Sequence, residues 1–152
     1  FTLHPSPFTL FYLLSLISLA ACDTTYQSSI PDRAVNLKLD LTFEDRGLVG
    51  MGGYEIITKP REANDRLGFG GILVFHAYDD NYYAFDLSCP YEANPNIRVA
   101  VDSTGIYAVC PNCGSRFDLS YGLAYPTQGP AKESLRRYAV TPGGGNILYV
   151  SN

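Results

Sequence analysis

The sequence predicts an all-β fold built from small antiparallel sheets. Its 152 residues include 12 Tyr and 8 Phe, together with 14 Gly and 10 Pro. Aromatic side chains favour strands, and Gly and Pro favour the turns between them. Short apolar runs recur between turn-forming stretches, and no segment keeps a helical period. With 46% hydrophobic and 17% charged residues, the composition is that of a globular domain with a packed core.

The first predicted strand covers residues 35–43, where apolar and polar residues alternate with a period of two. The later elements follow from the same strand and turn signals. They are, in order, a glycine-rich loop at 44–53, a strand at 54–58, a polar loop at 59–70, strands at 71–78 and 82–86 around the turn Asp79-Asp80-Asn81, a hairpin of 97–101 with 106–109, and strands at 116–119, near Leu123, at 136–141 and at 147–150.

Charge and histidine content exclude several functions. The formal net charge of −4 provides no electrostatic basis for binding nucleic acid. The chain has two histidines, His4 and His76, and no motif pairs a nucleophile with a base or one carboxylate with another. General acid–base chemistry therefore has few candidate residues. We expect a binding, structural or electron-transfer module and not a stand-alone enzyme.

Residues 1–21 are predicted to be a signal peptide. The apolar run FTLFYLLSLISLAA at 8–21 is shorter than an ordinary membrane-spanning helix and ends in small residues. The chain begins with Phe, and no Lys or Arg precedes the run, so we expect the natural start to lie upstream.

The end of this apolar run, together with the cysteine that follows it, suggests a lipid anchor. Leu19-Ala20-Ala21-Cys22 resembles the lipobox of bacterial lipoproteins, which implies that Cys22 is acylated and becomes the mature N-terminus. Residues 22–33 would then form the acylated N-terminus and its tether, ahead of a folded domain at 34–152. We expect the protein in the cell envelope, anchored by lipid to a membrane on its periplasmic or outer face.

The three remaining cysteines each follow a predicted strand. Cys110 and Cys113 have Cys-x-x-Cys spacing, and Cys89 lies in an earlier loop. This spacing allows two thiolates to converge on a metal ion, and it equally allows a redox-active disulfide. The residues alone leave both chemistries open.

The stretch from Cys89 to Val140 resembles a Rieske iron–sulfur domain. That family presents Cys-x-His in one loop and Cys-x-x-His in a second, so that two cysteines hold one iron and two histidines hold the other. Here the matching motifs are Cys89-Pro90-Tyr91, Cys110-Pro111-Asn112-Cys113, Gly114-Ser115-Arg116-Phe117-Asp118 and Gly129-Pro130-Ala131. The chain is also similar to lipoproteins of Bacteroides-like bacteria with altered ligand loops.

The resemblance implies a Rieske-like domain at 34–152 with a two-loop, cluster-binding subdomain at about 87–130. Cys89 and Cys110 match the two thiolate ligands, whereas Tyr91 and Cys113 occupy the two histidine positions. A [2Fe–2S] cofactor is implied by the family, but both of its histidine ligands are replaced. Two further residues are expected to support the site: Ser115 by a hydrogen bond toward sulfur, and Pro130 by stiffening the covering loop.

Four states of this site remain open at this stage. The leading expectation is a membrane-tethered binding or structural module that holds no metal. The alternatives are a disulfide among the three cysteines, zinc bound by three thiolates with Tyr91 or water as fourth ligand, and an electron-transfer centre with atypical ligands. An electron-transfer role would require a redox partner protein of the cell envelope.

Overall fold

The computed structural model describes residues 27–152. Within them, all regular structure consists of strands and one 3-10 turn, η1 (Arg46–Leu48), so the predicted all-β class is confirmed. The strands form two antiparallel sheets. None of the described residues belongs to a helix of the length and hydropathy needed to span a membrane. The predicted signal peptide, His4 and the predicted lipidation site Cys22 lie outside the described residues.

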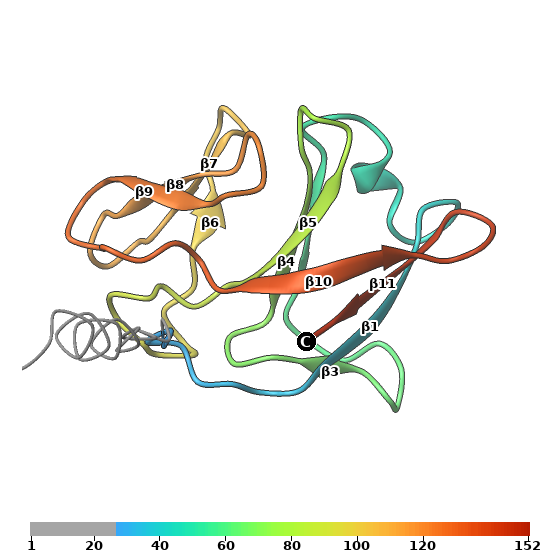
Figure 1. Ribbon diagram of the computed structural model, residues 1–152, viewed down its shortest axis with the longest axis horizontal. Coiled ribbons are helices and arrows are strands. Elements are labelled where there is room, and N and C mark those ends of the chain that lie inside the picture. The colour runs from blue at the N-terminus through green and yellow to red at the C-terminus, as the bar shows by residue number, and fades with distance from the viewer. Residues whose placement is uncertain (1–26) are drawn as a thin grey trace, which may run out of the picture.

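The larger sheet has seven strands in the order β2-β4-β5-β10-β11-β1-β3 and curls until it is nearly closed (Figure 1). Antiparallel pairing joins successive neighbours, for example β4 with β5 across the Asp79-Asp80-Asn81 turn, as predicted. The strands are β1 (Val35–Asp40), β2 (Tyr54–Ile57), β3 (Arg66–Leu67), β4 (Ile72–His76), β5 (Tyr82–Asp86), β10 (Arg137–Pro142) and β11 (Ile147–Ser151).

The smaller sheet has four strands in the order β6-β7-β8-β9. They are β6 (Ala100–Val101), β7 (Tyr107–Val109), β8 (Arg116–Asp118) and β9 (Tyr125–Gln128). All four lie in sequence between β5 and β10, which are hydrogen-bonded neighbours in the larger sheet. The chain therefore leaves the larger sheet after β5, builds the smaller sheet and returns.

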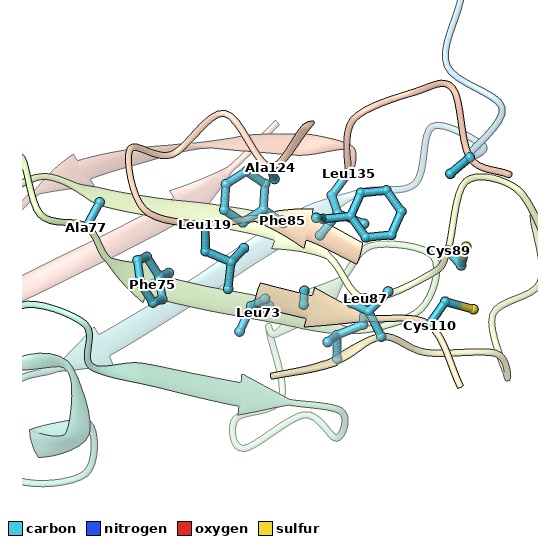
Figure 2. Close-up of a cluster of buried hydrophobic side chains, with 14 residues drawn as sticks. Leu73, Phe75, Ala77, Phe85, Leu87, Cys89, Cys110, Leu119, Ala124 and Leu135 are labelled. Atoms are coloured by element: carbon cyan, nitrogen blue, oxygen red, sulfur yellow. The ribbon is translucent and has the colours of Figure 1, made fainter. Parts of the chain in front are cut away.

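Strand β4 separates two hydrophobic cores. All five of its residues are buried, because alternate side chains point to opposite faces and both faces are covered. Leu73 and Phe75 pack with residues of the smaller sheet, and Ile72 and Val74 pack inside the larger sheet. Cys89 and Cys110 belong to the first of these cores, and Figure 2 shows them together at one end of it.

The structure corrects three predicted boundaries. The first strand ends at Asp40 and not at residue 43, because the Asp40 carboxylate accepts the Thr42 N–H at 2.9 Å and turns the chain. A short strand, β3, lies inside the predicted loop at 59–70, where it pairs with β1. The strand expected near Leu123 begins at Tyr125.

Candidate metal centre

Three thiols from two loops converge at the end of the core. The Sγ atoms of Cys89, Cys110 and Cys113 all lie within 4.8 Å of one another. The Cys89 and Cys113 sulfur atoms are 3.7 Å apart, and all three cysteines are free thiols. A disulfide needs sulfur atoms about 2.05 Å apart. Three cysteines placed this closely can bind a metal ion.

The first loop holds Cys89 just after β5. Its backbone N–H donates to the Ile97 carbonyl at 3.2 Å, and its own carbonyl accepts the Ala93 N–H at 2.9 Å. An isolated bridge between Ser88 and Arg98 continues this antiparallel pairing at the base of the loop. The Cys89 backbone is therefore fixed from both directions, and its side chain is buried.

The second loop connects β7 to β8 and carries the other two cysteines. Two backbone bonds close it: Cys110 N–H donates to the Ser115 carbonyl at 2.9 Å, and Gly114 N–H donates to the Cys110 carbonyl at 3.0 Å. The two loops are joined at their tips, where the Asn112 side-chain amide donates to the Glu92 carboxylate at 2.8 Å. The second loop therefore holds Cys110 and Cys113 in a tight turn against the first.

Ser115 connects Cys113 to a third segment. Its buried hydroxyl oxygen accepts the Cys113 S–H at 3.1 Å and the Ala131 N–H at 3.1 Å. Gly129 packs on the same residue with φ +90°, and a Cβ there would lie 2.5 Å from the Ser115 Cα. Glycine is therefore required for this approach, and residues 129–131 press directly on the cysteine loop.

The environments of two thiols differ in electrostatics. Burial of the Cys89 thiol disfavours its charged form and raises its pKa to about 12, with the neighbouring Cys110 and Cys113 thiols adding to the rise. Partial burial of Cys113 also opposes ionisation, but in the thiolate form the Ser115 hydroxyl and backbone N–H donate hydrogen bonds to the sulfur, which outweighs burial and lowers the Cys113 pKa. We therefore expect Cys113 to be the more reactive of these two thiols.

The side chains of the remaining predicted site residues, Tyr91 and Pro130, make no hydrogen bond to the thiols, although the Tyr91 backbone N–H does donate to the Cys89 sulfur. The Tyr91 side chain is 58% exposed, and no hydrogen bond joins it to a cysteine in the described residues. Pro130 is exposed on the neighbouring segment. Both line a shallow pocket of about 260 Å³ together with Pro90, Lys132 and Glu133.

Two contributions to the site were not predicted from the sequence. One is the Glu92–Asn112 bridge between the loops. The other is Ser29, whose hydroxyl donates to the Pro90 carbonyl at 2.7 Å. Their partners are 20 and 61 residues away in the chain, and no spacing rule for motifs covers such distances.

No protein-family model matches this chain, and no curated protein matches it. The likeness to Rieske domains, and with it the lipoprotein and electron-transfer expectations, therefore stays a prediction from the motifs.

Proposed function

We propose that this chain is a membrane-anchored, Rieske-like binding module of the cell envelope whose altered site binds one thiophilic metal ion, Zn²⁺ foremost. The observation that carries the proposal is the convergence of three cysteine Sγ atoms within 4.8 Å. The proposal modifies the expectation of a metal-free module and keeps its binding or structural role.

The meeting of the two loops supports the Rieske-like interpretation. The resemblance implies that the Cys89 loop and the Cys110–Cys113 loop lie against each other, and the Glu92–Asn112 bond and the sulfur positions agree with this. The hydrogen bond between Ser115 and Cys113 matches the supporting role implied for Ser115.

A standard Rieske cluster does not fit these residues, because that cluster needs two histidines on one iron. Among the described residues the only histidine is His76, which lies on β4. Its Nδ1 lies 2.8 Å from the Leu48 carbonyl oxygen and its Nε2 lies 3.0 Å from Asp80 Oδ1, so both ring nitrogens are already engaged. Tyr91 and Cys113 stand at the histidine positions, and we derive no electron-transfer step through a cluster.

The sulfur geometry suits a single zinc ion. Two thiolates bound tetrahedrally at about 2.3 Å from zinc lie about 3.8 Å apart, and Cys89 and Cys113 are 3.7 Å apart. Thiolates favour zinc and other soft ions over magnesium or calcium. The fourth position falls to water or to the Tyr91 phenolate. Burial disfavours the negatively charged thiolate of Cys89. A bound zinc ion displaces the thiol proton, and its positive charge then stabilises the buried thiolate.

Metal analysis of the full chain tests the proposal. We expect about one zinc per chain without sulfide, and loss of most of it in each of Cys89→Ser, Cys110→Ser and Cys113→Ser. Cys22→Ser is the matched control, which should release the protein from membranes yet retain zinc. Iron with equivalent sulfide would overturn the zinc assignment in favour of an atypical iron–sulfur centre. Metal-free protein containing a disulfide would overturn it in favour of a disulfide-closed module.

A separate experiment tests the likeness to Rieske domains. The double substitution Tyr91→His with Cys113→His rebuilds a set of two cysteines and two histidines at the matched positions. After reconstitution with iron and sulfide, we expect this variant to show the visible absorption and electron paramagnetic resonance of a [2Fe–2S] cluster with histidine ligands. The single variants are the controls, and a double variant that folds but binds no more cluster than they do would contradict the resemblance.

A further inference from the structure

Ser29 lies directly beside the cysteine site. The Ser29 hydroxyl donates to the carbonyl of Pro90, the residue next to Cys89, at 2.7 Å. The Ser29 N–H donates to Glu133 Oε2 at 3.0 Å. Figure 1 shows the blue start of the chain against the yellow-green loop that follows β5, at the end of the molecule opposite the β10–β11 turn. The segment from Ser29 to Asp32, through which the chain enters the folded domain (the entry segment), thus lies at the end of the domain that carries the thiols.

This entry segment is fixed to the domain and cannot swing freely. Ile30 is buried, with 1% of its surface exposed. The Arg136 guanidinium donates to the Ile30 carbonyl at 3.0 Å and to Asp32 Oδ1 at 2.7 Å. The Arg136–Asp32 ion pair is exposed and contributes little on its own. Together with the buried Ile30 side chain and the hydrogen bond to the Ile30 carbonyl, it attaches the segment from Ser29 to Asp32 to the domain.

The tether is shorter than the domain is wide. Ser29, which bonds to the folded domain, is the seventh residue after Cys22, and seven extended residues reach at most about 25 Å. A compact domain of the size described here has a radius of gyration of about 14 Å, which corresponds to a diameter of about 36 Å. An anchor at Cys22 therefore keeps the end with the cysteines within about 25 Å of the lipid, whereas the opposite end of the domain, about 36 Å away, is not held by this limit.

We propose that the end formed by Tyr91, Pro130 and Lys132 is an interaction surface for the lipid headgroups, so that the three-cysteine site faces the membrane. This inference rests on the acylation of Cys22 in the proposed function. The chemistry of the surface fits, because the exposed Tyr91 ring is suited to the membrane interface and the exposed Lys132 can pair with anionic headgroups. A molecule that reaches the thiols must then approach along the membrane plane.

The absence of tryptophan from the chain allows single-tryptophan reporters. Tyr91→Trp places a reporter at the proposed surface, and Phe43→Trp is the matched control. Phe43 is 68% exposed and follows the opposite end of β1 from the tether. Each full-length, acylated variant is reconstituted into vesicles of phosphatidylcholine and phosphatidylglycerol that contain headgroup-spin-labelled lipid. The same variants carrying Cys22→Ser provide the baseline for unanchored protein.

We expect the spin-labelled lipid to quench Tyr91→Trp at least threefold more than Phe43→Trp, and to quench neither when Cys22 is replaced. Equal quenching of the two anchored variants would overturn the orientation while leaving the anchor intact. Mass spectrometry of Cys22 tests acylation separately from the orientation of the domain. A chain without acyl groups at Cys22 would overturn the anchor and this orientation together, and it would leave the zinc assignment to its own test.

Discussion

Gly129→Ala is the substitution that most directly tests how residues 129–131 support the cysteine site. Gly129 has φ +90°, and an added Cβ would lie 2.5 Å from the Ser115 Cα, 2.7 Å from its Oγ and 2.8 Å from its N. Ordinary contacts begin at 3.4 Å. The backbone of Ser115 or of residue 129 must therefore retreat by about 0.9 Å, the difference between these distances.

The expected cost has two parts. A non-glycine residue held in this region of φ is strained by about 1–3 kcal/mol, and displacing a packed backbone adds about 1–3 kcal/mol, as in other overpacked sites. We therefore expect the free energy of unfolding to fall by about 2–6 kcal/mol. Zinc affinity should also fall at least tenfold, because metal sites tolerate ligand shifts of only about 0.2 Å and Ser115 holds Cys113.

Urea unfolding followed by circular dichroism gives the first quantity, and competition with a chromophoric zinc chelator gives the second. Gly144→Ala is the matched control, since a Cβ at Gly144 meets nothing within 4 Å, and it should change unfolding by no more than about 0.5 kcal/mol. If Gly129→Ala unfolds and binds zinc like Gly144→Ala, the close approach to Ser115 is not a determinant of the site.

Three further predictions concern single residues. Ser115→Ala should weaken zinc binding by about 10–100-fold in the same competition assay. The control Ser103→Ala, at an exposed position, should leave zinc affinity unchanged. Equal zinc affinities of the two variants would show that Ser115 does not support the site. In metal-free, reduced protein at pH 8, iodoacetamide should modify Cys113 at least about tenfold faster than Cys89, because burial raises the Cys89 pKa to about 12 and the Cys113 pKa is lowered. Peptide mass spectrometry measures the two rates, and faster modification of Cys89 would contradict this order of thiol pKa values. Tyr138→Phe should lower the free energy of unfolding by about 1–3 kcal/mol, because the Tyr138 hydroxyl donates to the buried Asp86 carboxylate at 2.7 Å; an unchanged urea midpoint would show that this bond contributes nothing.

Local patterns predicted the strands that dominate the fold. The run GILVFHAY predicted β4 because a strand with both faces covered needs apolar residues at nearly every position. The alternation from Val35 predicted β1, but its end depends on the Asp40 carboxylate, which bonds the backbone of the turn in place of a neighbouring strand. Strand β3 could not be predicted, since its two residues form a strand only by pairing with β1.

The candidate site was predictable in part. Cys-x-x-Cys spacing predicts that Cys110 and Cys113 lie together, because a tight turn fixes their separation. Cys89 is 24 residues from Cys113, and its 3.7 Å approach depends on the pairing of two distant loops, which only the resemblance implied. The attachment of Ser29 beside Pro90 has no signal in the sequence, because one serine in a polar stretch reveals nothing about a partner 61 residues away.

We propose that three thiolates hold one metal ion at the position where the resemblance would place a Rieske cluster. X-ray absorption at the zinc edge of the full chain, purified from membranes under reducing conditions, tests it most directly by counting ligands. We expect three sulfur ligands at about 2.3 Å and one oxygen ligand, with one sulfur ligand lost in Cys113→Ser and none lost in Cys22→Ser. Two sulfur ligands or fewer in the unaltered chain, or an iron signal with bridging sulfide in place of zinc, would contradict it.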